Sequence, residues 1–167
     1  MKSLIAAFCL TLSFSSFAFN VGKVDIQQVL LTIKEGKSVR DKLKKEFEKK
    51  KKVLDKEQNK IKKMQEDFQK QSLVMSEKAK LEKEKKIQEL IIKLQQQSMG
   101  YQKEIQEMEN KMKKPILDRV RAVINSVSKQ KNVDVTFEAS TAPVVYAKNE
   151  IDITEEVIKS YDKKHSK

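Results

Sequence analysis

Lysine is the residue type through which this chain can act on other molecules. The sequence holds 36 Lys and Arg against 24 Asp and Glu, and the excess is confined to one segment. Residues 37–131 carry 28 basic and 15 acidic side chains, a balance of +13, whereas the remaining residues after 18 carry 7 and 9. Such a field attracts acidic polypeptides, anionic lipid head groups or nucleic acid. The alternative is that these lysines only solvate a long helix.

Side chains suited to enzymatic chemistry are scarce. His165 is the only histidine and lies close to the end of the chain, and the three glycines are isolated, so there is no phosphate-binding loop. Most carboxylates alternate with lysines, as in residues 82–85, which is typical of pairing on a helix surface. We therefore expect no enzyme activity, no metal and no cofactor. Specific nucleic-acid binding is also not expected, because stacking aromatics are few and tryptophan is absent.

The first eighteen residues have the pattern of a signal peptide. Lys2 gives a positive start, residues 4–14 form an apolar run, and Ser16 and Ala18 are the small residues that precede cleavage. The run is shorter than the roughly 20 residues that a transmembrane helix needs. We expect cleavage after Ala18 and export of the product. Cleavage also removes Cys9, the only cysteine, so that disulfides are excluded from the mature chain.

Two apolar seams position the lysines. Between residues 87 and 112 the spacing alternates between four and three, which predicts a coiled coil, and a second seam recurs every seven residues upstream. The gap between the seams is short, and Ser76 can cap a returning helix. Residues 36–131 are therefore predicted to form an α-helical hairpin arm. The downstream seam comprises Ile87, Ile91, Leu94, Ser98, Tyr101, Ile105, Met108 and Met112; the upstream seam comprises Phe47, Leu54, Ile61, Phe68 and Met75.

The two chain ends are predicted to form a separate body. Residues 133–139 alternate apolar and polar, residues 21–26, 144–147 and 150–153 also favour strands, and a short helix follows over 155–161. The fold class is α+β, with a long antiparallel helical hairpin inserted into a small β-sheet body of residues 19–35 and 132–161; residues 162–167 are a polar tail.

This body is predicted to oligomerise. Its two segments total only about 47 residues, and few domains of that size are stable alone without disulfides or metal. After Pro115 the apolar density of the returning helix rises, which indicates that it enters a better-packed base. The side chains expected to build the oligomerisation body are Val24, Ile26, Val133, Val135, Phe137, Ile151 and Ile153.

Binding residues are expected beside the seams, because seam residues are normally buried by the partner helix. The upstream seam is incomplete, since Lys50 and Glu57 occupy its second row. Apolar residues off the seams or at the tip would line a weakly apolar, basic surface that suits loose holding of diverse unfolded chains. For the tip, the alternative is simple packing of the turn. The candidate client-binding residues are Val53, Leu73, Val74, Met75, Leu90 and Ile92.

The order and spacing of several segments resemble the Skp/OmpH family of periplasmic chaperones. The resemblance implies a homotrimer, with a β body and three helical arms that enclose a cavity and hold unfolded outer-membrane proteins in the periplasm without ATP. The alternatives are a structural coiled-coil adaptor of the cell envelope, or a binder of anionic lipid or lipopolysaccharide surfaces. The segments that carry the resemblance are residues 22–30, the lysine-rich hairpin, residues 115–120, residues 133–139, Tyr146 and residues 152–154.

Overall fold

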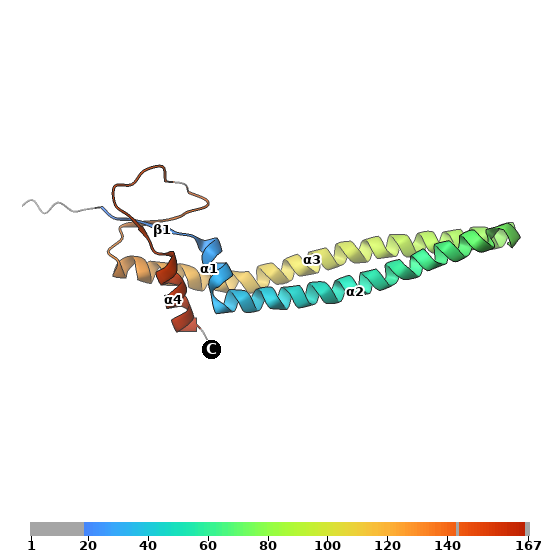
Figure 1. The fold of residues 1–167 in the computed structure, drawn as a ribbon, viewed down its shortest axis with the longest axis horizontal. Helices are drawn as coiled ribbons and strands as arrows, with labels where there is room; N and C mark the ends of the chain where they lie inside the picture. Colours follow the sequence, from blue (N-terminus) through green and yellow to red (C-terminus); the bar gives the residue numbers. More distant parts are fainter. Residues whose placement is uncertain (1–18, 143, 166–167) are drawn as a thin grey trace, which may run out of the picture.

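The structure is a computed structural model that describes residues 19–142 and 144–165. Two long helices extend from a small body at one end of an elongated molecule (Figure 1). The predicted signal peptide, residues 1–18, lies outside the described residues. In chain order the elements are β1 (Val21–Val24), α1 (Ile26–Thr32), α2 (Lys34–Gln71), the 3-10 turn η1 (Ser72–Val74), α3 (Glu77–Gln130), β2 (Val135–Glu138), β3 (Glu150–Asp152) and α4 (Thr154–His165).

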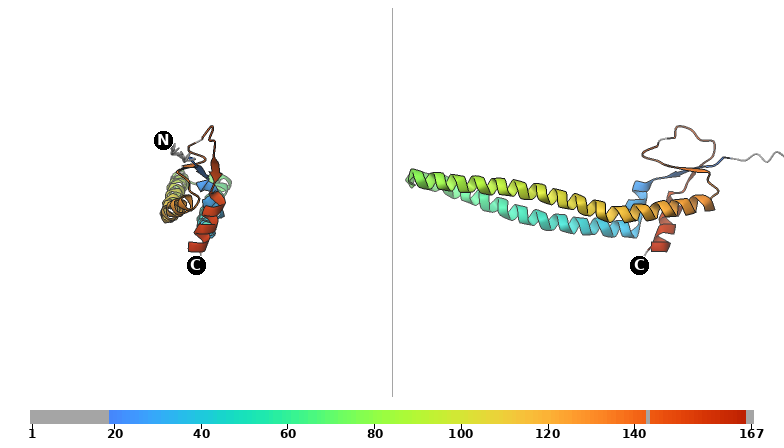
Figure 2. Two further views of the ribbon diagram at one scale, coloured as in Figure 1. Left: turned by 90° about the vertical axis from the view of Figure 1, so that its left-hand side faces the viewer. Right: turned by 180° about the vertical axis from the view of Figure 1, so that it is seen from behind.

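Helices α2 and α3 lie side by side and form the arm (Figures 1 and 2). Residues 37–71 contain no Gly or Pro and are rich in Lys, Glu, Gln and Leu, which are strong helix formers. At the tip η1 turns the chain, and the Ser76 hydroxyl accepts a hydrogen bond from the Ala79 N–H at 3.3 Å, which caps α3. With 54 residues, α3 extends for about 80 Å at 1.5 Å per residue.

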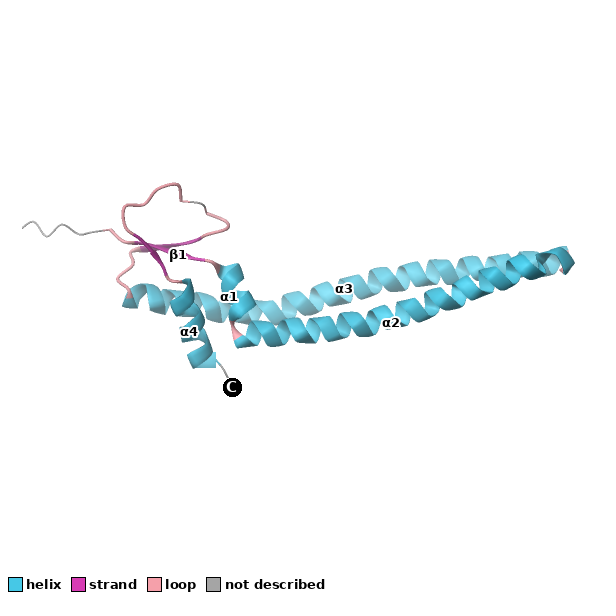
Figure 3. Ribbon diagram, viewed as in Figure 1, coloured by secondary structure: helices cyan, strands magenta, loops and turns pink. Residues whose placement is uncertain are grey.

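The body contains a three-stranded sheet with the order β2-β1-β3, in which both outer strands are parallel to β1 (Figure 3). Val21 pairs with Val135 on one side and with Glu150 on the other. Neighbouring parallel strands need a crossover connection. Between β1 and β2 this connection is α1 and the entire arm, so the arm is inserted within the sheet of the body.

The core of the body is built mainly by helices. Among the described residues, Val24 and Ile153 are the members of the buried cluster that come from the strands or their ends. The end of α3 supplies a buried stripe, as the rise in apolar density after Pro115 predicts, and the body therefore extends beyond residues 19–35 and 132–161. The other members of the cluster are Val29 and Ile33; Ile116, Val120, Val123 and Val127 of α3; and Val157, Ile158 and Tyr161 of α4.

Several element boundaries differ from the predictions. Ile26 begins α1 instead of ending a strand, because the Asp25 carboxylate accepts a hydrogen bond from the Gln28 N–H at 2.8 Å and caps the helix. Residues 144–147 form no strand, and the Val145 side chain is fully exposed. Helix α4 continues to His165, so residues 162–165 are helical and not a tail.

A tight joint connects the body to the arm. The chain turns at Ile33 between α1 and α2, and a Cβ atom added to Gly36 would lie only 1.9 Å from the Leu30 carbonyl oxygen. Nearby, Glu35 accepts hydrogen bonds from the Tyr161 hydroxyl and the Arg119 guanidinium, both at 2.6 Å. Burial and the adjacent Glu35 carboxylate raise the pKa of the Tyr161 hydroxyl. The joint therefore ties α2, α3 and α4 together where the arm begins.

Candidate binding surface of the helical arm

The seam residues of α3 are covered, whereas those of α2 are covered unevenly. None of the eight seam residues between 87 and 112 is exposed, and Ile87 is buried. On α2 the seam residue Ile61 is buried, but the side chain of Phe47 is 54% exposed. The contact between the two helices therefore covers the α2 seam less completely at Phe47, near the body, than at Ile61, nearer the tip.

The residues predicted to bind a client lie in separate places. Leu73 and Val74 come together in η1 at the tip, where their side chains are 92% and 88% exposed, and Met75 beside them is half-buried. Val53 on α2 and Ile92 on α3 are partly exposed, and Leu90 is half-buried. The pattern reasoning missed two further exposed apolar side chains of α3, Leu81 and Met99.

The residues predicted for the oligomerisation body are similarly divided. Val24 and Ile153 are fully buried, and Ile26 and Ile151 pack against the core from its edge. Val133 precedes β2 and is half-buried, as is Phe137 within that strand. Val135 is half exposed. The sheet edge therefore offers apolar surface that this single chain does not cover.

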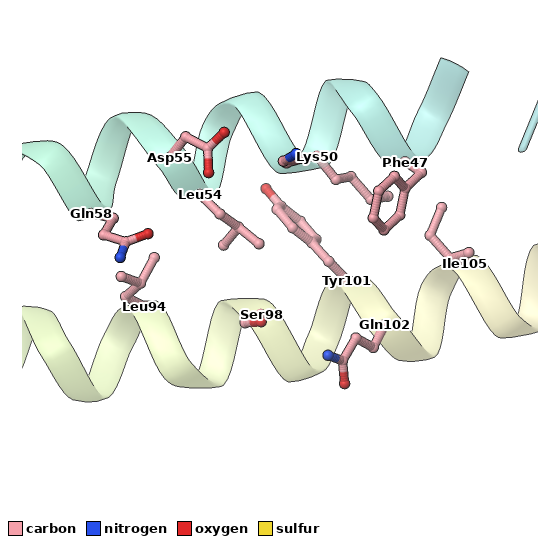
Figure 4. A pocket seen from close by; sticks show the side chains of 11 residues that line it. Phe47, Lys50, Leu54, Asp55, Gln58, Leu94, Ser98, Tyr101, Gln102 and Ile105 are labelled. Carbon is pink, nitrogen blue, oxygen red and sulfur yellow. The ribbon is translucent and has the colours of Figure 1, made fainter. Parts of the chain in front are cut away.

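A groove that sequence reasoning did not predict lies between α2 and α3 (Figure 4). It has a volume of about 430 Å³ and is lined mainly by seam residues that the coiled-coil pattern assigns to helix contact. The only indications in the sequence are Lys50 and Ser98, two non-apolar residues at seam positions. The lining residues are Phe47, Lys50, Lys51, Leu54, Asp55 and Gln58 of α2, and Leu94, Ser98, Tyr101, Gln102 and Ile105 of α3.

Tyr101 and Lys50 form the wall of this groove (Figure 4). The Lys50 ammonium lies 4.3 Å from the centroid of the Tyr101 ring, a cation–π arrangement, and also pairs with Glu104. The Tyr101 hydroxyl accepts a hydrogen bond from the Gln97 amide at 2.9 Å. Because its polar atoms are satisfied, Tyr101 can remain beside the opening without a desolvation penalty.

The groove continues toward the tip. A second hollow of about 610 Å³ shares Asp55, Gln58 and Leu94 with the first and is further lined by Lys62 and Ile91. Three lysines and one aspartate line the two hollows together. The arrangement thus offers an extended, partly apolar channel with a basic rim.

The lysine field of the arm is only partly neutralised by local ion pairs. Lys80 pairs with Glu77 at 2.7 Å, and Lys103 pairs with Glu107 at 3.8 Å, both along one helix. Exposed pairs of this kind contribute only about 0–1 kcal/mol each. Because basic residues outnumber acidic ones by 28 to 15 between 37 and 131, the arm keeps a strong positive potential. Among the described helices, none combines the length and apolarity required to cross a membrane.

Comparisons with known proteins identify a matching family, a relative in sequence and a solved structure with a similar fold. The family model described as outer membrane protein (OmpH-like) matches residues 20–161. A protein of Aquifex aeolicus (strain VF5) without an assigned function is 29% identical over 148 residues, which is 89% of each chain. A crystal structure from Caulobacter crescentus CB15, described as a candidate outer membrane chaperone (OmpH-like), superimposes with a TM-score of 0.73 at 16% identity, covering 88% of this chain and 86% of the other. This last similarity concerns the fold.

Proposed function

The chain belongs to the OmpH-like family, and from this premise we propose that it is an ATP-independent holdase chaperone of the periplasm. Its clients would be unfolded outer-membrane proteins, which it would keep from aggregating. The observation that carries the proposal is the combination on one arm of a +13 charge balance with highly exposed apolar side chains, of which Leu73 and Val74 are the most exposed. We further propose that a signal peptide cleaved after Ala18 directs export.

Capture would begin with long-range attraction. The lysines draw acidic segments of the unfolded client toward the arm, over a screening length of about 8 Å at physiological ionic strength. Many individually small apolar contacts then hold the chain without selecting one sequence, as at other promiscuous surfaces. The tip and the partly exposed Val53 and Ile92 supply such contacts, together with Met75 and Leu90 beside them.

The holdase would act as a homotrimer. A small body with a single core of modest size gains most from association. Support comes from apolar side chains that stand exposed at the body: Val135 on β2, and Val145 and Tyr146 in the loop before β3. Three bodies joined through these surfaces would carry three arms around a common cavity.

The holdase proposal is tested by an aggregation assay. An outer-membrane β-barrel protein unfolded in denaturant is diluted into buffer with and without a stoichiometric amount of the mature protein, at low and at high salt. We expect light scattering to be suppressed, and more strongly at low salt, because salt screens the lysines. Unchanged scattering at low salt would exclude the holdase and favour a structural adaptor of the envelope. Mass measurement of the same sample tests the trimer, which a stable monomer would contradict.

A further inference from the structure

We propose that the groove between α2 and α3 is a docking site for aromatic side chains of extended, acidic client segments. This inference rests on the proposed holdase function and specifies the chemistry that one part of the arm recognises. The groove is defined by Phe47, Leu54, Ser98, Tyr101 and Ile105, with Lys50 in its wall and Lys51 at its rim.

The shape of the groove follows from one small residue in the seam. Ser98 occupies a position where the heptad pattern calls for a large apolar side chain. Ser98 lines a hollow of about 430 Å³ together with Leu54 and Leu94 (Figure 4). This volume falls within the range of about 300–1,000 Å³ that is typical of ligand sites. One bulky side chain fits it.

The chemistry of the walls favours an aromatic occupant. Phe47 from α2 and Tyr101 from α3 both line the hollow, and the Phe47 ring is 54% exposed. Aromatic pairs gain about 0.5–1.5 kcal/mol beyond the burial of their area. The Lys50 ammonium, already 4.3 Å from the Tyr101 centroid, also lines the hollow, where a second ring would find a cation beside it.

The charge of the rim selects the residues that flank this aromatic side chain. Lys50 is paired with Glu104, so that Lys51 and Lys62 are the further lysines that line the joined hollows, beside the carboxylate of Asp55. An aromatic residue with Asp or Glu neighbours matches both the apolar floor and the basic rim. Because the two hollows share lining residues, the channel suits an extended segment better than a compact one.

Fluorescence offers a clean test, because the chain contains no tryptophan. The probe is a ten-residue peptide with one Trp flanked by Asp and Glu, titrated with the full mature protein. The first variant, Ser98→Leu, completes the seam and fills the groove. Its matched control, Gly100→Leu, adds the same side chain two residues further along α3, where a Cβ meets no atom within 4 Å. A second variant, Phe47→Ala, removes an exposed wall of the groove without touching the core.

We expect a saturable blue shift with the wild type and with Gly100→Leu, at least tenfold weaker binding with Ser98→Leu, and weaker binding with Phe47→Ala. Circular dichroism should show Ser98→Leu to be as thermally stable as the wild type or more so. Competing peptides with Phe or Tyr in place of Trp should displace the probe better than a Leu peptide. Equal binding by Ser98→Leu and wild type, or no saturable binding at all, would overturn the docking site. If the wild type nevertheless suppresses aggregation, the holdase proposal stands without the groove.

Discussion

The body and the arm of this molecule use apolar residues in opposite ways. The body gathers eleven buried side chains from α1, α3, α4 and the strand ends into one cluster. In the arm between residues 37 and 112, a much greater length, the buried apolar side chains are Ile61 and Ile87, while Leu73, Val74 and Leu81 face solvent. The body therefore supplies the stability of the fold, and the arm keeps its apolar surface available for contacts.

The polar interactions of the two regions differ in the same sense. In the body they join residues far apart in sequence: the Thr154 hydroxyl accepts from the Asp25 N–H at 3.0 Å, and Glu35 receives Tyr161 and Arg119. In the arm most ion pairs join residues three or four positions apart on one helix. Hydrogen bonds between distant residues fix the body, whereas the arm is stabilised by ion pairs within single helices. This difference would let the arm bind many different clients.

The largest difference between the two regions is expected when one isoleucine in each is truncated to alanine. Ile153→Ala removes a fully buried side chain from the body and should lower the free energy of unfolding by about 2–5 kcal/mol. Ile92→Ala, at a position 46% exposed on α3, should change it by no more than about 0.5 kcal/mol. Urea unfolding followed by circular dichroism measures both. Equal losses would show that the arm, too, has a tightly packed core.

The joint between the two regions should respond to loss of one hydroxyl. Tyr161→Phe removes the hydrogen bond to Glu35 and should cost about 1–2 kcal/mol, allowing for the partial exposure of that carboxylate. Because the folded state raises the pKa of Tyr161, its contribution is present below the unfolded value of about 10 and is lost as pH rises above it. The wild type should therefore lose more stability than the variant between pH 9 and 11.

The tip should affect activity and not stability. Replacing Leu73 and Val74 together by serine removes two highly exposed apolar side chains, so the midpoint of unfolding should stay within about 0.5 kcal/mol of the wild type. Suppression of client aggregation should weaken, so that more of the variant is needed for the same effect. Full activity of the double variant in the light-scattering assay would argue that the tip only completes the turn.

The smallest expected effect concerns Glu138 at the end of β2. Its carboxylate accepts hydrogen bonds from the Ser140 hydroxyl and the Thr141 N–H, both at 2.7 Å, which lowers its pKa to about 2. A lowered pKa stabilises the fold above the unfolded value of about 4.5, and this contribution is lost as pH falls toward 2. Glu138→Gln should thus reduce the difference between the urea midpoints at pH 7 and pH 3. Glu84→Gln, on the exposed surface of the arm, should leave that difference as in the wild type.

Periodic features of this fold could be predicted from the sequence. Ser76 begins α3 as a capping residue, and the apolar residues after Pro115 enter the core, because helix capping and helical periodicity are local properties of the chain. Predictions based on β propensity were less successful. Residues 144–147 have strand-forming side chains, but β propensity reflects how well a side chain fits a half-buried sheet surface. Val145 is fully exposed in this chain and has no such surface to pack against.

The groove could not be predicted because it depends on two helices at once. Ser98 and Lys50 each interrupt the seam mildly, and only their positions on facing helices create the hollow beside Tyr101. Likewise, the strand predicted over residues 21–26 ends at Val24, because Asp25 directly follows β1 and caps α1. The sequence pattern predicts which residues share a face of each helix, whereas the groove forms only where α2 and α3 pack together.

Hydrogen exchange tests most directly the claim that the arm binds clients while the body maintains the fold. Amide exchange of the full mature protein is measured by mass spectrometry, alone and with an equimolar unfolded outer-membrane β-barrel protein. We predict new protection in α2, η1 and α3 between residues 43 and 108, and unchanged exchange in α4 and in residues 116–127 of α3. Protection confined to the body, with the arm unaffected, would contradict the account.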